Sequence, residues 1–247
     1  MELIEAHSNT SIAEAVLTQP PLVSIVIPAY NERETVASVV ERVYYTMCSL
    51  MYPFEIIVVD DGSLDATFEA ASILGTRVIR NQINMGKGLA LRRGFEAAQG
   101  DIVVSIDADG SHNPEELDRF IYPLLSENDG IEAVIGSRFA GPHLPEGLTF
   151  SHRLGNRLVN ALFFFLSGRY YSDTQCGYRA FRRDLLTKLR PLANRFDIES
   201  EMLMLMQRYV GVAVVPINSS RRLGGKSSLN IVSDGIRILL SLLRVAP

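Results

Sequence analysis

The chain has 247 residues, of which 47% are hydrophobic and 21% are charged. That length suits one large α/β domain or two small domains, and the composition excludes a wholly disordered chain. The net charge of −4 hides a split between the halves: residues 1–130 hold 8 Lys/Arg against 20 Asp/Glu, a net of −12, whereas residues 131–247 hold 16 against 8, a net of +8. This asymmetry predicts an anionic partner for the second half: phosphate, nucleic acid or a membrane surface.

The N-terminal residues and the cysteines bear on the compartment. Residues 1–21 have no basic segment followed by an apolar core, so they do not read as a signal peptide and are expected to form a flexible leader. Two cysteines cannot build a disulfide framework, which favours a reducing compartment. No run of about 18 apolar residues is present, so the sequence contains no evident spanning helix.

Strands and helices alternate through the first half. Short β-branched runs predict strands at 23–28, 54–60, 76–80, 101–107 and 131–137, and the segments between them predict helices at 31–47, from 64, at 86–99 and from 113. Asn31 followed by Glu34 has the spacing of a capping box. The alternation predicts an α/β fold, with a mostly parallel, Rossmann-like sheet covered by helices on both faces. Ligands of such sheets bind beyond the carboxyl ends of the strands.

The second half is less regular. It predicts a helix at 153–167, a turn-rich segment at 172–181, a helix at 197–209, a strand at 211–217, a basic glycine-rich loop at 221–228 and an amphipathic helix at 229–245. We therefore expect a main domain over 22–228 and a C-terminal amphipathic helix over 229–247.

Two pairs of acidic residues follow predicted strands. Asp107 and Asp109 come directly after an apolar strand and can both reach one hard cation, because Mg²⁺ and Mn²⁺ prefer carboxylates completed by water and substrate phosphates. Capping of the next helix is the competing explanation, but Asn113 is better placed for that role. Asp60 and Asp61 end another strand and could accept hydrogen bonds from a base or a ribose; a plain turn is the alternative there.

Other motifs carry weaker signals. Lys87 opens a predicted helix, where a diphosphate could meet both an ammonium group and backbone N–H groups. No G-x-G-x-x-G fingerprint is present, and a Walker loop ending at Ser227 is excluded because position 220 is serine. The four histidines lack metal-ligand spacing, so we expect them at surface or loop positions.

Taken in order, the motifs resemble a known family. V-S-I-V-I-P-A-Y-N-E at 23–32, V-D-D-G-S at 59–63, G-K-G at 86–88 and D-A-D-G at 107–110 together resemble family 2 glycosyltransferases of the GT-A fold. G-S-R at 136–138, D-T-Q-C-G-Y-R at 173–179 and R-L-G-G-K-S at 222–227 are similar to the branch of dolichyl-phosphate mannose synthases and dolichyl-phosphate glucosyltransferases.

The resemblance implies a nucleotide-sugar donor, GDP-mannose or UDP-glucose, and a polyprenyl (dolichyl) phosphate acceptor. It implies site residues as well: Pro28, Tyr30, Glu32, Asp60 and Asp61 around the nucleoside, Asp107 and Asp109 on Mg²⁺ or Mn²⁺, and Arg138, Arg153 and Arg222 at the acceptor phosphate or the donor diphosphate. Ser111 stands where the mannose synthases usually have glutamine, so its expected part in the metal shell is through water.

The chemistry of the acceptor determines the expected mechanism. A phosphate monoester is already an anion near pH 7, so positioning and charge neutralisation replace a strong base. In-line attack would invert the anomeric carbon and give a β-linked lipid phosphate sugar, with mannose expected first and glucose as the alternative. A soluble enzyme with a hydroxyl acceptor is the other alternative, and it would need a carboxylate base, for which Asp173, Asp197 and Glu199 are candidates.

Membrane contact is expected without a span. The helix at 153–167 contains the apolar block Ala161-Leu-Phe-Phe-Phe-Leu166 behind two arginines, and the helix at 229–245 offers a second apolar stripe. The competing explanation is that both stripes pack on the sheet. We expect a protein on the cytoplasmic side of a membrane, bound peripherally or held by an anchoring partner.

Two further classes are disfavoured. A nucleic-acid-binding module would interleave aromatic residues with its basic ones. Here the most concentrated aromatic cluster, Phe163 to Phe165, lies in one apolar helix, and the acid pairs would repel phosphate, so no nucleic-acid partner is expected. The chain has no tryptophan, which excludes the Q-x-x-R-W signature of the processive synthases of the same superfamily.

Overall fold

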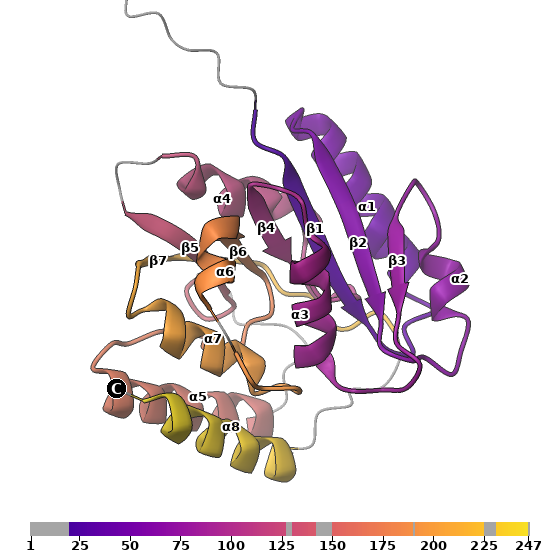
Figure 1. Cartoon of the computed structure of the whole chain (residues 1–247). Helices are drawn as coiled ribbons and strands as arrows, with labels where there is room; N and C mark the ends of the chain where they lie inside the picture. The colour runs from indigo at the N-terminus through magenta and orange to yellow at the C-terminus, as the bar shows by residue number, and fades with distance from the viewer. Residues whose placement is uncertain (1–19, 127–129, 142–149, 190, 225–230, 247) are drawn as a thin grey trace, which may run out of the picture.

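The computed structural model describes residues 20–126, 130–141, 150–189, 191–224 and 231–246, so nearly all of the expected leader lies outside the described residues. Its centre is a seven-stranded sheet in the order β3-β2-β1-β4-β6-β5-β7 (Figure 1). The strands are β1 (Val23–Ala29), β2 (Phe54–Asp60), β3 (Arg77–Arg80), β4 (Ile102–Ser105), β5 (Ile131–Ser137), β6 (Arg179–Arg182) and β7 (Gly211–Pro216). The α/β prediction is confirmed.

All strands except β6 run in the same direction. β1 pairs in parallel with β2 and β4, β2 with β3, and β5 with β7, whereas β6 lies antiparallel between β4 and β5. The carboxyl ends of six strands therefore meet at one edge, and the chain enters β6 from that same edge. This edge gathers the motifs that the sequence spreads over more than a hundred residues.

The strand β6 corrects the sequence analysis, which predicted a turn-rich segment over 172–181. The run Arg179-Ala-Phe-Arg182 is short and carries an arginine at each end, so it lacks the apolar pattern of a buried strand. Pairing on both sides makes it a strand, because the neighbours β4 and β5 satisfy its backbone groups. The guanidinium of Arg179 is buried and donates to the backbone carbonyls of Thr174, Cys176 and Glu199. These hydrogen bonds connect the loop before β6 to the first turn of α7 (Ile198–Met206).

Helices cover both faces of the sheet and bury two apolar cores. The first core lies under α1 (Val36–Leu50) and α4 (Leu117–Ile121), and the second lies under α3 (Lys87–Ala97), α5 (Phe150–Ser167), α6 (Arg183–Lys188), α7 (Ile198–Met206) and α8 (Ile231–Val245). Alternate strand residues serve the two cores: Ile25 and Ile27 face the first, and Val26 faces the second. The short α2 (Thr67–Ala71) lies near the β3 edge. α5 and α8 lie side by side, and α8 also packs on α7 (Figure 1).

The predicted capping box at Asn31 is wrong. The helix α1 starts at Val36, five residues later than Asn31, which adopts a left-handed conformation with φ of 55°. The Asn31 backbone N–H donates to Ser63 Oγ, and Asn31 Oδ1 accepts from the Leu64 N–H. The asparagine therefore ties the loop after β1 to the loop after β2, a tertiary contact that local capping rules do not anticipate.

Candidate active site

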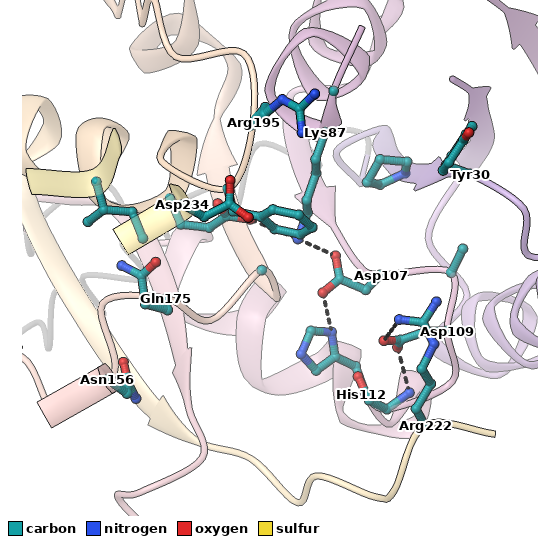
Figure 2. Close-up of a pocket in the computed structure, with 18 of the residues that line it drawn as sticks. Tyr30, Lys87, Asp107, Asp109, His112, Asn156, Gln175, Arg195, Arg222 and Asp234 are labelled. Atoms are coloured by element: carbon teal, nitrogen blue, oxygen red, sulfur yellow. Dashed lines mark hydrogen bonds and ion pairs between the residues drawn. The ribbon is translucent and has the colours of Figure 1, made fainter. Parts of the chain in front are cut away.

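A cavity of about 810 Å³ opens at the edge where the strands end. Ten of the residues expected at the site line it: Pro28, Tyr30, Glu32, Asp61, Lys87, Asp107, Asp109, Ser111, Arg138 and Arg222. Figure 2 shows Asp107 between Lys87 and His112, and Asp109 against Arg222. The expected residues Asp60, Arg153 and Asp173 are not among the residues lining the cavity.

Asp107 lies just beyond β4 and is the centre of a buried charge cluster. The Lys87 ammonium is 2.6 Å from its Oδ1, and His112 Nδ1 is 3.9 Å from its Oδ2. Burial by itself would raise the pKa of Asp107, but Lys87 and His112 outweigh it and lower that pKa to about 2. The carboxylate is therefore ionised throughout the neutral range. Burial lowers the pKa of His112, so its contact with Asp107 is not an ion pair at neutral pH.

Asp109 is joined to a segment more than a hundred residues away. Arg222 Nη1 donates to Asp109 Oδ2 at 3.1 Å, and the same guanidinium binds the carboxylate of Glu32. The backbone of Leu223 donates to the Asp109 carbonyl, so the segment that carries Arg222 lies along this loop. Burial raises the pKa of Glu32 to about 7, with Asp109 adding to the increase and Arg222 opposing it. Arg222 thus bridges two acidic side chains at the mouth of the strands.

The two acids after β2 have different surroundings. Asp60 is fully buried, accepts a hydrogen bond from the Ser63 N–H and pairs with Arg80 at 3.2 Å. These contacts stabilise the turn after β2. Asp61 lines the cavity, and its carboxylate accepts the N–H groups of Met85 and Gly86. The turn explanation therefore describes Asp60 well, whereas Asp61 holds the loop before α3 against the cavity.

Arg138 follows β5 and is held by Asp173. Its Nε and Nη2 donate to the two oxygens of Asp173 at 2.7 and 2.9 Å, and Asn156 also donates to that carboxylate. Asp173 is fully buried. Burial would raise its pKa, but Arg138 outweighs that effect and lowers it. Its carboxylate is therefore a poor proton acceptor, which argues against the general-base role considered for Asp173.

Sequence reasoning missed several cavity residues or assigned them elsewhere, among them His112, Gln175, Arg195, Phe196 and Glu199. His112 corrects the expectation of surface histidines, since it is buried and lies against Tyr178. Glu199 entered only as a candidate base, and the structure places it 2.7 Å from Lys87. Gln175 lies in the loop that enters β6 from this edge, and the short β6 gave no periodic signal that would have located that loop.

One end of the cavity is largely apolar. It lies between α5 and α8 and is lined there by Leu158, Val159 and Leu162 from one helix and by Ile238 and Leu239 from the other. Asn156 of α5 and Asp234 of α8 are polar residues that also line the cavity. Gly155 and Gly235 also line it, and a Cβ added at either position would meet no atom within 4 Å. The two glycines therefore keep open space between the helices.

The remaining predictions for the basic residues give a mixed result. Arg153 lies in the first half of α5, half-buried and outside the lining of the cavity. The basic loop at 221–228 is described only up to Gly224.

In the part of the chain that the structure describes, no helix is both long and apolar enough to cross a membrane.

The donor set at this edge suits a hard divalent cation. No group of three or more His, Cys, Asp or Glu side chains forms a cage among the described residues. A Mg²⁺ that keeps water and phosphate ligands needs only one or two carboxylates, however. Asp107 and Asp109 supply two in the same cavity, and Ser111 lies beside them. These residues fit such an ion once a substrate phosphate completes its shell.

Comparison with known proteins places this geometry in a family. Residues 24–190 match the family "Glycosyl transferase family 2". The chain is 34% identical over 234 residues to glycosyltransferase AglJ of Haloferax volcanii, covering 92% of this chain and 73% of that protein. It is 30% identical over 221 residues to the UDP-N-acetylglucosamine–dolichyl-phosphate N-acetylglucosaminyltransferase of Methanococcus voltae, covering 80% and 85%.

A solved structure supports the same assignment. Glucosyl-3-phosphoglycerate synthase from Mycobacterium tuberculosis, crystallised with Mn²⁺, UDP and phosphoglyceric acid, superposes with a TM-score of 0.73 at 26% identity, covering 91% of this chain and 78% of that one. Three observations point to the same family: the topology of the sheet, the acid pairs at its carboxyl edge and the match to the family model. This chain has the GT-A fold and belongs to glycosyltransferase family 2.

Proposed function

We propose that this glycosyltransferase moves a sugar from a nucleoside diphosphate sugar to a polyprenyl phosphate. The observation that carries the proposal is the shape of the cavity, which joins two unlike environments. One end holds Asp107, Asp109 and Arg138 at the strand edge, and the other is the apolar space between α5 and α8. A molecule with a phosphate head and a hydrocarbon tail matches both ends, and the dolichyl-phosphate enzyme of Methanococcus voltae supports this acceptor class.

The basic side chains suit an acceptor that arrives as an anion. Arg138 lines the cavity with its guanidinium oriented by Asp173, and arginine presents a planar donor set that matches phosphate oxygens. A phosphate monoester carries its own negative charge at neutral pH, so attack needs alignment rather than proton removal. Direct attack at the anomeric carbon inverts it, so an α-linked donor gives a β-linked product.

The donor diphosphate would lie at the aspartate edge. Asp107 and Asp109 would hold Mg²⁺ or Mn²⁺ there, and the bound ion would supply positive charge against the diphosphate. The Mn²⁺ in the structure of the Mycobacterium tuberculosis enzyme supports this use of a divalent ion. Pro28, Tyr30, Glu32 and Asp61 line the adjoining part of the cavity and are our candidates for the nucleoside.

The outer faces of α5 and α8 suit a lipid surface. Phe163, Ile238 and Leu242 pack in the core, whereas Phe165 is 82% exposed and Leu240 is 60% exposed. Packing on the core therefore accounts for one face of each helix, and the other face is exposed. We propose peripheral binding through the exposed faces, which lie beside the apolar end of the cavity and would bring it to the bilayer.

The donor is tested first. A thermal-shift screen with Mn²⁺ would compare GDP-mannose, UDP-glucose and UDP-N-acetylglucosamine, because a ligand that binds only the folded state raises the melting temperature. Mannose is our first expectation, and stabilisation by a UDP-sugar alone would contradict it.

The acceptor is tested with the donor so identified. We expect transfer to a polyprenyl phosphate and a loss of that activity in Gly235→Leu, which fills the apolar end, while donor binding is unchanged. Ala161→Leu, which makes a small-to-leucine change at an exposed position of α5, is the matched control and should remain active. Equal activity of both variants, or transfer only to free sugar hydroxyls, would contradict the proposal.

A further inference from the structure

The guanidinium of Arg222 lies between carboxylates from two different loops. Its Nη1 donates to Asp109 Oδ2 at 3.1 Å, in the loop after β4, and its Nη2 donates to Glu32 Oε1, in the loop after β1. The Nε donates to the carbonyl of Gly224 at 2.7 Å, within the arginine's own turn. Each of the three nitrogens therefore has a protein acceptor, and two of the three acceptors are acidic side chains that line the cavity.

Glu32 is the more firmly held of the two acids. Its Oε2 accepts the Thr35 hydroxyl at 3.1 Å, and its backbone N–H donates to Thr67 Oγ1 at 2.8 Å. Its carbonyl accepts the N–H groups of Thr35 and Val36 at the start of α1. Backbone and side chain are thus both fixed, so Glu32 offers the arginine a rigid partner.

The segment that carries Arg222 is held by its backbone as well. The Ser220 N–H donates to the Ser111 carbonyl at 3.0 Å, and the Leu223 N–H donates to the Asp109 carbonyl at 3.1 Å. Neither contact involves a side chain. The guanidinium can therefore change partners by side-chain rotation while the segment stays on the loop after β4.

A divalent ion at the strand edge would compete with Arg222 for Asp109. Asp109 Oδ1 accepts the Ser111 N–H at 2.9 Å, and Oδ2 accepts the arginine. A divalent cation and a guanidinium on one carboxylate repel each other. With both carboxylates ionised, Glu32, Asp109 and Arg222 together carry a net charge of −1, and an added divalent ion changes it to +1. The group then attracts a diphosphate instead of repelling it.

We propose that Glu32 is a positioning residue for Arg222. Arg222 gives up Asp109 when a divalent ion binds there, and Glu32 keeps the guanidinium beside that ion, where the released N–H groups bind the donor diphosphate. Arginine suits this exchange because one arm of its fork can stay on Glu32 while the other turns to phosphate. The inference rests on the divalent ion and the donor of the proposed function, and it assigns Glu32 to the arginine in place of a direct nucleoside contact.

Mn²⁺ binding without nucleotide tests the competition. Electron paramagnetic resonance of free Mn²⁺ would give the dissociation constant of each variant. We expect Arg222→Gln to bind Mn²⁺ about tenfold more tightly than the wild type, because Asp109 no longer has a charged hydrogen-bond partner to give up. Arg195→Gln is the matched control, since it removes an arginine that lines the same cavity but does not pair with Asp109 among the described residues. It should stay within about twofold of the wild type.

A double-mutant cycle tests the positioning role. Calorimetry with Mn²⁺ would measure the affinity of UDP and of GDP for Glu32→Gln, Arg222→Gln and the double variant. We expect Glu32→Gln to weaken the nucleoside diphosphate that binds by about tenfold in the wild-type background and by less than about twofold in the Arg222→Gln background. Glu34→Gln, an exposed acid of the same loop that does not line the cavity, should have no effect in either. A direct nucleoside contact, or a role confined to the fold, would give equal losses in both backgrounds.

Several results would overturn the inference. They are unchanged or weaker Mn²⁺ binding in Arg222→Gln, an equal gain in Arg195→Gln, or a Glu32→Gln effect of the same size in both backgrounds. Lack of transfer to polyprenyl phosphate, with these binding results as expected, would refute the proposed acceptor and leave the exchange standing. Lack of any nucleoside diphosphate binding by the wild type would refute the proposed donor and this inference together.

Discussion

The guanidinium of Arg138 donates two parallel hydrogen bonds to the carboxylate of Asp173, at 2.7 and 2.9 Å. The carboxylate is fully buried, and the arginine lines the cavity. The two residues lie 35 positions apart, at the end of β5 and in the loop before β6. The pair orients one face of the guanidinium and leaves Asp173 with little basicity. The acid is therefore best understood as a positioning residue for the arginine.

Arg138→Lys should impair acceptor use far more than donor binding. Lysine keeps the charge but loses the bidentate geometry that Asp173 and a phosphate require. We expect kcat/KM for the acceptor to fall by at least about tenfold, with the donor dissociation constant nearly unchanged. Arg138→Ala is less informative, because stranding the buried Asp173 carboxylate costs about 3–5 kcal/mol in stability. Equal losses for donor and acceptor, measured by calorimetry and a transfer assay, would contradict the assignment.

Asp109→Ala should strongly reduce transfer and weaken donor binding in the presence of Mg²⁺ or Mn²⁺. Removing a group that helps to stabilise developing charge reduces turnover by about 10²- to 10³-fold. The measurement is a titration of activity against the divalent ion, with Asp118→Ala as a control, because that carboxylate is exposed and does not line the cavity. Unchanged turnover in Asp109→Ala would refute the metal assignment.

His112 should make the protein less stable in mild acid. Burial lowers its pKa below the ordinary value of about 6.5, with Asp107 and Asp109 only partly opposing the effect. Below that ordinary value the unfolded chain binds more protons at this site than the folded protein, so stability is lost as the pH falls. In urea unfolding without metal, the free energy of unfolding of the wild type should decrease more between pH 7.5 and pH 5.5 than that of His112→Gln. Parallel pH profiles would show that His112 contributes nothing.

Charged substitutions on the outer helix faces should release the protein from membranes. Phe165→Glu and Leu243→Glu both change exposed side chains, so the fold should tolerate them. We expect each to reduce cosedimentation with vesicles that contain anionic lipid, while donor affinity stays the same. A matched change away from this surface, Tyr45→Glu on the exposed side of α1, should have no effect. Equal vesicle binding by all the variants would argue against a lipid-facing α5 and α8.

Much of the fold follows from the local pattern. The β-branched runs of β1, β2 and β5 are apolar enough to be buried on both faces, and their alternation with helices determines a parallel sheet. The same rule locates Asp107 and Asp109 at the edge where ligands bind. Family motifs extended this to Arg138 and Arg222, which line the cavity.

Only the tertiary structure placed Glu199, His112 and β6. The four residues of β6 have no strand periodicity of their own, and their neighbours in the sheet define them. Glu199 reads locally as an acid in the first turn of a helix, a common and favourable position. Its burial against Lys87 arises from a contact between residues more than a hundred positions apart. Hydrophobic periodicity is a property of neighbouring residues, so it predicts the sheet and its edge; which charges share one buried space depends on the packing of distant segments, and only the folded chain decides that.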